Sequence, residues 1–209
     1  PGPLTLLLQK TKRVPAVVTA GLPTVAIRMP SHPIARSLIQ LAGVPIAAPS
    51  ANIAGKPSPT HAVHAFEDLV GKATWIIDSG SAWSGVESTI LDVTHDPPLL
   101  LRPGAVTKEQ IEKVIGRVDV HFIVLNPEGS TSKKTIALAP GMKYRHYAPK
   151  ASVWLVAPQK LGQTAKKASK KKLVAVLSLK RVLSKNALAF RFSSAKEMAR
   201  DLFHCFRLC

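Results

Sequence analysis

Short apolar runs alternate with polar, proline-containing or glycine-containing stretches along most of the chain. Aliphatic runs of about four to eight residues are typical of strands, and apolar residues three or four positions apart indicate helices. The pattern predicts strands at residues 4–9, 24–28, 44–48, 73–78, 87–93, 99–101, 153–157, 173–177 and 188–192. It predicts helices at residues 32–42, 60–70, 107–115, 161–170 and 195–206. Strands that alternate with helices indicate an α/β fold with a mostly parallel sheet.

Polar residues beside these segments predict where several helices begin and end. Ser31 and Thr60 each stand at the start of a helical pattern and are expected to cap it, and Gly43 is expected to end the first helix. Thr107 and Gln110 have the three-residue spacing of a capping box, in which each side chain bonds the other residue's backbone N–H.

A change of composition divides the chain. Residues 122–135 have no hydrophobic period and contain Pro, Gly, Ser and Lys, which is typical of a linker. The stretch that follows, residues 139–149, is unusual for a linker because it contains Tyr, His and Arg. Rings and cations at this place indicate docking onto a ligand or a domain surface. A second α/β segment follows residue 149 and is shorter than a usual complete domain.

The formal net charge of +17 is concentrated toward the C-terminal part, where residues 151–209 contain 13 Lys and Arg but 2 Asp and Glu. The densest cluster comprises Lys166, Lys167, Lys170, Lys171 and Lys172. Such a cluster attracts the phosphates of a nucleotide or an RNA, although a solvated helix end has the same composition. No apolar run reaches the roughly 18 residues of a membrane span. Two cysteines, Cys205 and Cys209, are too few for a disulfide framework.

Polar residues at the ends of predicted strands are the candidates for chemistry. Ser50 and Asn52 follow the strand at 44–48 and precede a helix, an arrangement by which open α/β sheets bind anions; an ordinary connecting loop is the alternative. Arg28 and Arg102 each end an apolar strand. A guanidinium there can grip a carboxylate or a phosphate with two hydrogen bonds, unless it is an ordinary surface residue.

A second group of anion-binding candidates begins the strand at 87–93. Ser88 and Thr89 follow the Gly- and Ser-rich residues 79–85, so their hydroxyls and the loop N–H groups can cradle an anion. A β-prone Ser-Thr pair without a ligand is the alternative.

Several familiar catalytic motifs are absent from the sequence. It contains no P-loop, no dinucleotide-binding glycine motif and no nucleophile elbow. His61 and His64 lie three apart on one predicted helix, but no further ligand is near them in sequence, so we expect surface or partly buried side chains and no metal site. The candidates are Arg, Ser, Asn and Thr, with no side-chain nucleophile or base. That set suits phosphate binding and electrostatic stabilisation better than nucleophilic catalysis.

Six short segments, in this order and spacing, resemble one known family. They are PGPLT at residues 1–5, VAIRMP at 25–30, APSAN at 48–52, GVEST at 85–89, LRPG at 101–104 and KYRHYAP at 143–149. The chain is therefore identified as a member of the YrdC family of threonylcarbamoyl-AMP synthases, in its longer, two-domain form. The resemblance implies a twisted mixed sheet with helices over residues 1–121 and a linker that covers the active site over residues 122–150. A Rossmann-like C-terminal domain would occupy residues 151–209.

The resemblance also implies a reaction, its ligands and their contacts. L-threonine, bicarbonate and ATP with Mg²⁺ give threonylcarbamoyl-AMP and pyrophosphate in the cytoplasm, and a transferase then passes the threonylcarbamoyl group to an adenosine of tRNA. Threonine contacts are implied at Arg28, Ala48 and Ser88. ATP contacts are implied at Thr24, Ser50, Asn52, Ser58, Arg102, His146 and Tyr147. Tyr144 and Arg145 are alternatives to the two linker residues. From its charge, the basic C-terminal part is expected to make a weak contact with tRNA.

The chain departs from the family at both ends. The family has an N-terminal region with a Lys/Arg motif that grips the triphosphate, and neither is found in these 209 residues. We also expect the C-terminal domain to be incomplete. Strand 4–9 is apolar on both faces, as interior strands are, and its neighbours are expected from upstream sequence. We therefore expect the 209 residues alone to lack synthase activity. The rival hypotheses are a non-catalytic basic RNA-binding module of the same fold and a carbamoyltransferase-associated homologue that uses a related adenylate.

Overall fold

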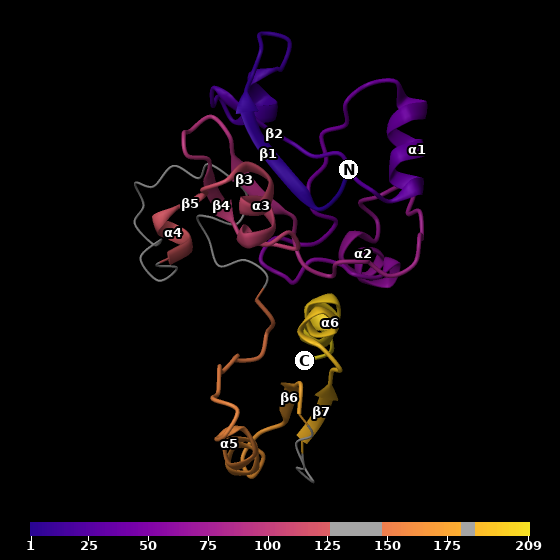
Figure 1. Ribbon diagram of the computed structural model, residues 1–209. Coiled ribbons are helices and arrows are strands. Elements are labelled where there is room, and N and C mark those ends of the chain that lie inside the picture. The colour runs from indigo at the N-terminus through magenta and orange to yellow at the C-terminus, as the bar shows by residue number, and fades with distance from the viewer. Residues whose placement is uncertain (126–147, 181–186) are drawn as a thin grey trace. The chain divides into compact units, whose positions relative to one another are not determined.

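The computed structural model describes residues 1–125, 148–180 and 187–209 (Figure 1). The chain divides into two compact units, each built from two separate stretches of sequence. The first unit comprises Pro1–Ser50 and Val86–His146, and the second comprises Ala51–Gly85 and Tyr147–Cys209. Over the described residues, no helix is long and apolar enough to span a membrane.

The first unit contains a five-stranded mixed sheet in the order β2-β1-β3-β4-β5. The strands are β1 (Leu4–Gln9), β2 (Thr24–Ile27), β3 (Thr89–Asp92), β4 (Leu99–Arg102) and β5 (Asp119–Val120). β1 runs antiparallel to β2 and parallel to β3, and β4 runs antiparallel to β3 and parallel to β5. The expectation of a mostly parallel sheet is wrong, because short connections after β1 and β3 return the chain in the opposite direction. The mixed sheet that the family resemblance implied is confirmed.

Strand β1 lies inside this sheet, as its two apolar faces predict. Its neighbours β2 and β3 both come from within the chain, so the expectation of upstream neighbours is wrong. Leu7 of β1 packs with Ile90 and Leu101 in one apolar cluster. Leu4 and Leu6 pack instead against a second apolar cluster, which consists of Leu91, Leu100, Ile111 and Val118.

The helices of the first unit begin and end largely where their signals predict. They are α1 (Pro33–Ala42), α3 (Lys108–Ile115) and α4 (Phe122–Leu125), with a 3₁₀ turn at Ala16–Thr19. Gly43 ends α1 in the left-handed conformation at φ 65°, as predicted. The residue before α1 is His32 rather than Ser31, and no side chain caps this helix. The capping box of α3 is confirmed.

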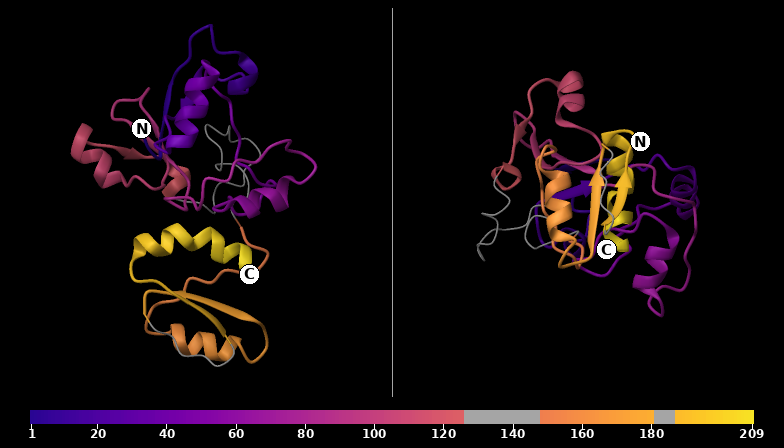
Figure 2. Two further views of the ribbon diagram at one scale, coloured as in Figure 1. Left: turned by 90° about the vertical axis from the view of Figure 1, so that its right-hand side faces the viewer. Right: turned by 90° about the horizontal axis from the view of Figure 1, so that it is seen from below.

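The second unit contains three helices and two parallel strands among its described residues. They are α2 (Ala62–Leu69), α5 (Leu161–Ala168), β6 (Val174–Ser178), β7 (Ala187–Arg191) and α6 (Ala195–Leu208). The strands lie between α5 and α6 (Figure 2). The predicted cap of α2 is wrong, because its N-terminal flanking residue is His61 rather than Thr60. The Ser194 hydroxyl caps α6 by accepting a hydrogen bond from the Glu197 N–H.

Three predicted strands, at residues 44–48, 73–78 and 153–157, are absent, and these residues have no regular structure. Each is an apolar run, but its side chains are largely exposed; Leu155, for example, is 100% exposed and Trp75 is 87% exposed. A strand requires a neighbouring backbone to pair with its N–H and C=O groups. No such neighbour occurs among the residues described, and Pro45 has no N–H to offer in any case.

We expect Thr107→Ala to lower the free energy of unfolding by about 1 kcal/mol, because it removes the hydroxyl that accepts the Gln110 N–H at 3.3 Å. Thr107→Ser is the matched control, since it keeps that acceptor. Urea unfolding of the three proteins measures the effect. Equal losses in both variants would show that the threonine methyl group, not the cap, stabilises this helix.

Candidate functional site

Four neighbouring strands of the first unit, β2, β1, β3 and β4, each have one end on the same side of the sheet. This row of strand ends is the sheet edge that carries the candidate site. In β1 and β3, Leu4 pairs with Thr89, which brings Thr5 and Ser88 together. Their hydroxyl oxygens lie 2.8 Å apart, and both residues are buried. On β4, Arg102 is the antiparallel partner of Ile90, so its guanidinium lies close to Ser88 at the start of β3.

Arg102 and Ser88 are in direct contact. Nε and Nη2 of Arg102 donate to the Ser88 carbonyl oxygen at 3.1 and 2.9 Å, and Nη2 also reaches the Ser88 hydroxyl at 3.1 Å. The Glu87 carboxylate lies 3.6 Å from the same Nη2, and the Arg102 side chain is 15% exposed. The structure therefore joins an expected ATP contact, Arg102, to an expected threonine contact, Ser88.

Gly104 allows this close approach of β4 to the beginning of β3. A Cβ atom at Gly104 would lie 2.4 Å from the Glu87 carbonyl oxygen and 2.4 Å from the Thr89 nitrogen. Both atoms belong to the backbone and cannot move aside without shifting the strand. The backbone of the next residue, Ala105, donates to the Glu87 carbonyl at 3.1 Å. Only glycine fits at this position in the LRPG segment.

Thr89 has a structural role rather than the anion-binding role that was one prediction. Its side chain is fully buried, and its hydroxyl donates to the Val106 carbonyl and accepts from the Val106 N–H. Its own backbone N–H donates to the Pro3 carbonyl at 3.0 Å. The hydroxyl and N–H groups of Thr89 thus bond to the protein itself, and this prediction is wrong for Thr89.

Arg28 comes directly after β2 at the same edge of the sheet. Ile27 pairs with Leu6, so the register carries Arg28 to a position beside Thr5 of β1. Arg28 is exposed, in keeping with a residue that meets a ligand from solvent. Thr24 begins β2 at the far end of that strand. Ala48 and Ser50 are exposed and lie in the irregular segment that replaces the predicted strand at 44–48.

The second unit contains two further candidates, Asn52 and Ser58, in the loop before α2. The Asn52 side-chain amide donates to the carbonyls of Ile53 and Lys56 at 2.9 and 3.3 Å. Its Oδ1 atom is buried and has no hydrogen-bond partner among the described residues. Because an unpaired buried acceptor costs about 1–3 kcal/mol, Asn52 is suited to receive a hydrogen bond from a ligand hydroxyl. Ser58 is buried in the same loop.

A buried carboxylate, Asp68 of α2, holds this loop in place. It accepts hydrogen bonds from Lys56 Nζ at 2.6 Å, from the Ile53 N–H at 3.3 Å and from Arg207 Nη2 of α6 at 2.7 Å. Arg207 also donates to the Pro57 carbonyl at 2.6 and 3.1 Å. The Asp68 and Arg207 side chains are 0% and 8% exposed. This ion pair has no signal in the sequence, because its partners lie 139 residues apart.

The pKa of Asp68 reflects the same contacts. Burial by itself raises the pKa of this carboxyl group, but the hydrogen bonds from Arg207, Lys56 and Ile53 outweigh burial and lower it from 3.8 to about 2. Asp68 is therefore ionised at neutral pH and compensates the buried charge of Arg207. The two expected linker contacts, His146 and Tyr147, lie outside the described residues.

The fold is that of an α/β protein with a mixed sheet, and arginine and hydroxyl side chains line the strand ends that form its candidate site. Two protein-family profiles match the chain. Residues 1–104 match the family described as telomere recombination, which includes Sua5, YciO and YrdC proteins, and residues 106–209 match the threonylcarbamoyl-AMP synthase C-terminal domain. The chain belongs to the two-domain threonylcarbamoyl-AMP synthase family, so the resemblance of its six segments is confirmed. The domain boundaries at residues 121 and 150 stay a prediction.

Individual relatives agree with this assignment. The threonylcarbamoyl-AMP synthase of Pyrococcus abyssi is 58% identical over 156 residues, which are 75% of this chain and 44% of that protein. The Bacillus subtilis enzyme is 53% identical over 152 residues, which are 72% of this chain and 42% of that protein. A crystal structure of P. abyssi Sua5 complexed with L-threonine matches 99% of this chain and 61% of its own, with a TM-score of 0.87 and 47% identity. The aligned residues thus span less than half the length of these two curated relatives.

We expect Asp68→Asn to lower the free energy of unfolding at pH 7 by about 3 kcal/mol, because it leaves Arg207 and Lys56 without their carboxylate. The low folded-state pKa of Asp68 stabilises the protein above the unfolded-state value of 3.8, and this stabilisation is lost as pH falls through about 2. The difference in free energy of unfolding between wild type and Asp68→Asn therefore narrows by about 2 kcal/mol from pH 5 to pH 2.

Denaturant unfolding at several pH values measures both effects. Glu67→Gln, which removes the neighbouring exposed carboxylate on the same helix, is the control and should change stability little. If the difference in free energy of unfolding between wild type and Asp68→Asn stays constant down to pH 2, Asp68 does not have a lowered pKa in the folded protein.

Proposed function

We propose that this chain provides the threonine-binding and ATP-binding sheet edge of an enzyme that makes threonylcarbamoyl-AMP and pyrophosphate from L-threonine, bicarbonate and ATP. The observation that carries the proposal is the direct contact of Arg102 with Ser88, since it joins the two expected ligand sites. Arg28 lies at the same edge. The family relationship supports the same reaction.

The proposed chemistry relies on binding and charge, and each residue has a separate role. Arg28 grips the threonine carboxylate with its planar guanidinium, and the Ser88 hydroxyl bonds the amino acid. The carbamate formed from threonine and bicarbonate attacks the α-phosphorus of Mg·ATP. A bond from a carbamate oxygen to phosphorus forms, the bond to the bridging oxygen breaks, and pyrophosphate leaves. Arg102 stabilises the negative charge that develops on the phosphate oxygens.

The nucleotide's remaining contacts are proposed for the polar residues that the family resemblance implies. Thr24, Ser50 and Ser58 offer hydroxyl groups, and Asn52 offers a buried acceptor that has no donor within residues 1–125, 148–180 and 187–209. His146 and Tyr147 are proposed to cover the nucleotide from the linker. The activated threonylcarbamoyl group then serves a tRNA-modifying transferase, because a mixed carbamic–phosphoric anhydride is a donor for group transfer.

The test is threonine-dependent and bicarbonate-dependent release of pyrophosphate from ATP. It should be measured for the 209-residue chain and for a version extended at the N-terminus with the corresponding region of the P. abyssi relative. We expect turnover by the extended version alone, because several cations are needed to hold a triphosphate. Pyrophosphate release that is independent of threonine in the extended version would overturn the proposal and favour a related adenylate-forming homologue.

We expect Arg102→Ala, in the extended version, to lower kcat/KM about 10²–10³-fold, by analogy with the loss of an oxyanion-stabilising donor. Arg117→Ala is the matched control, because Arg117 is exposed and pairs only with the nearby Asp119 among its described contacts. Pyrophosphate release and thermal unfolding are measured in parallel. An unchanged rate in a folded Arg102→Ala variant would exclude the assigned role.

We expect Arg28→Lys to raise the KM for threonine at least about tenfold while the KM for ATP stays near the wild-type value. An ammonium group cannot replace the two parallel hydrogen bonds of a guanidinium to a carboxylate. Arg13→Lys, another exposed arginine of the first unit, is the control. A similar rise of both KM values would indicate that Arg28 supports the fold rather than binding threonine.

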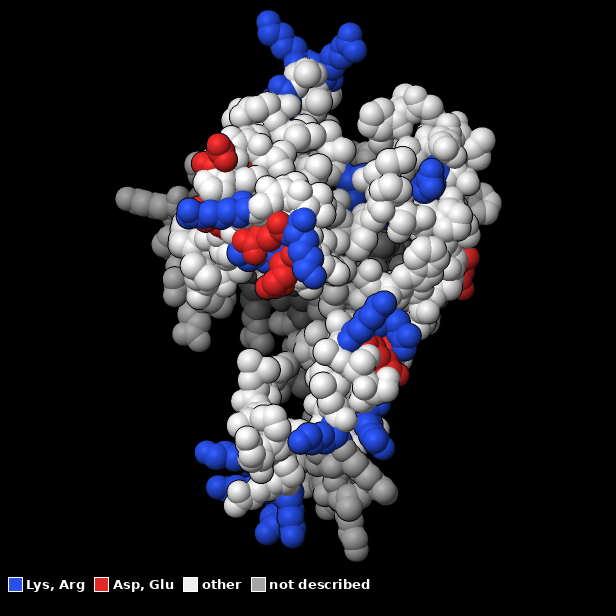
Figure 3. Space-filling model, in the orientation of Figure 1, with Lys and Arg blue, Asp and Glu red and all other residues white. Residues whose placement is uncertain are grey.

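RNA binding without catalysis is the second candidate function, and one feature favours it. All five lysines of the basic cluster are exposed to solvent: Lys166, Lys167, Lys170, Lys171 and Lys172. Figure 3 shows Lys and Arg side chains gathered around the end of the second unit that contains α5. Phosphate-driven binding of tRNA weakens steeply as salt rises, whereas pyrophosphate release needs no RNA. The two functions are therefore separable in the same preparation.

A further inference from the structure

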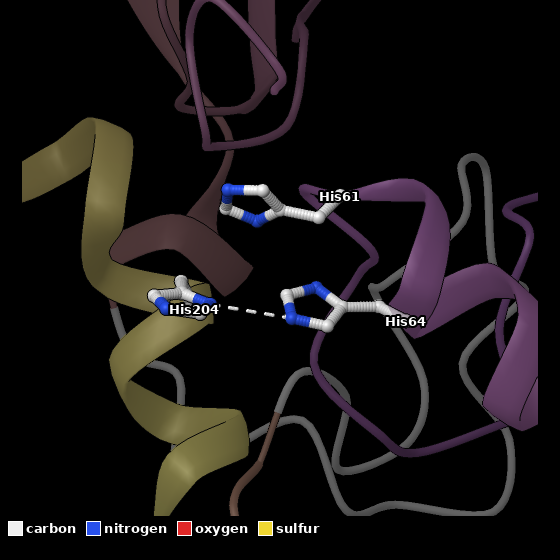
Figure 4. A group of neighbouring side chains, drawn as sticks. All are labelled: His61, His64 and His204. Carbon is white, nitrogen blue, oxygen red and sulfur yellow. Dashed lines mark hydrogen bonds between the residues drawn. The ribbon is translucent and has the colours of Figure 1, made fainter. Parts of the chain in front are cut away.

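Three histidine side chains converge within the second unit (Figure 4). His61 and His64 lie at the start of α2, and His204 lies on α6. One ring nitrogen from each lies within 4.8 Å of the others. His64 is buried, and the other two side chains are half-buried. The candidate contacts of the proposed synthase do not include any of these residues, so the cluster needs its own explanation.

The spacing of two of these nitrogens is that of ligands around one metal ion. His64 Nε2 and His204 Nδ1 lie 3.2 Å apart. With metal–nitrogen bonds of about 2.0–2.1 Å, tetrahedral ligand nitrogens lie about 3.3 Å apart. His61 is the ligand that must move closer; its ring is half-buried and already lies 4.7 Å from the His204 ring, centroid to centroid. A cation would thus take the place of the proton that His64 and His204 now share.

Thr60 provides the outer hydrogen bonds that orient two of the rings. Its hydroxyl lies 3.2 Å from His61 Nδ1 and 3.5 Å from His64 Nδ1, which leaves the Nε2 atom of each ring for the metal. The Thr60 N–H donates to His64 Nδ1 at 3.2 Å, so the proton of the metal-free His64 ring is on Nε2. Metal binding at Nε2 moves this proton to Nδ1, so His64 gives up the hydrogen bond from the Thr60 N–H and donates instead to the buried Thr60 hydroxyl.

The charged groups near the cluster are paired with one another. Asp201, one turn before His204 on α6, pairs with Arg200 at 3.0 Å. Arg207, on the same helix, pairs with Asp68 at 2.7 Å. Each of these two arginines therefore has a carboxylate partner that offsets its positive charge.

We propose that His61, His64 and His204 bind one divalent transition-metal ion of the Zn²⁺ class, with the fourth position open to water. Three imidazoles suit Zn²⁺, Ni²⁺ or Cu²⁺, whereas Mg²⁺ prefers oxygen ligands, so this ion is distinct from the one that accompanies ATP. Because its ligands come from residues 51–85 and from α6, the ion links the two stretches of sequence that form the second unit. Metal binding should accordingly stabilise the folded chain.

The test starts from the 209-residue chain after treatment with a chelator. Zn²⁺ binding is measured by titration calorimetry, and Co²⁺ is used as a spectroscopic probe of the same site. We expect a stoichiometry of one, a visible d–d absorption band of tetrahedral Co²⁺ and a rise in Tm with Zn²⁺. His61→Gln and His204→Gln should each abolish the tight site and the rise in Tm. Thr60→Val should weaken Zn²⁺ binding about 10–100-fold, as loss of outer partners does.

Two controls locate the site. His95→Gln removes an exposed histidine of the first unit, and Cys209→Ser removes the exposed thiol; both should bind Zn²⁺ like wild type. The metal-free Tm of each variant shows that it is folded. Absence of one-to-one binding by wild type, or unchanged binding by folded His204→Gln, would overturn the proposal. None of these readouts depends on synthase activity.

Discussion

The parallel pairing of β1 with β3, in which Leu4 lies beside Thr89, fixes the sheet edge that carries the candidate site. Side chains of a strand alternate between two faces, so a slip of one residue would turn Thr5 away from Ser88 and send Leu7 out of its apolar cluster. The core and the site therefore enforce the same register. β2 and β4 are then aligned by β1 and β3, which brings Arg28 and Arg102 to one edge.

Local signals in the sequence predicted the elements whose stability is mostly local. The capping box of α3, the glycine that ends α1 and the amphipathic pattern of α6 lie where their residues indicate, because neighbours in sequence supply the interactions. The apolar run at 44–48 resembles a strand equally well and is not one. Strand formation depends on a partner backbone elsewhere in the chain, which a pattern of single residues does not contain.

The same limit explains which parts of the site were predictable. Arg28 and Arg102 stand at strand ends, a position visible in sequence. Thr5 was missed because only its contact with Ser88, 83 residues away, distinguishes it from other strand threonines. His61 and His64 were visible as a pair, but the third imidazole comes from a helix 140 residues further along. Contacts between residues this far apart in sequence become visible only in the folded structure.

The ion pair of Asp68 with Arg207 has a consequence for the order in which the protein matures. Residues 51–68 are synthesised first, but the arginine that compensates the buried Asp68 follows 139 residues later. At about 5–20 residues per second, translation needs roughly 7–28 s to cover that distance. Lys56 is the partner available to Asp68 in the meantime. The loop that carries Asn52 and Ser58 thus reaches its final form only after α6 has left the ribosome. Ordering of this loop therefore depends on the synthesis of a helix much later in the chain.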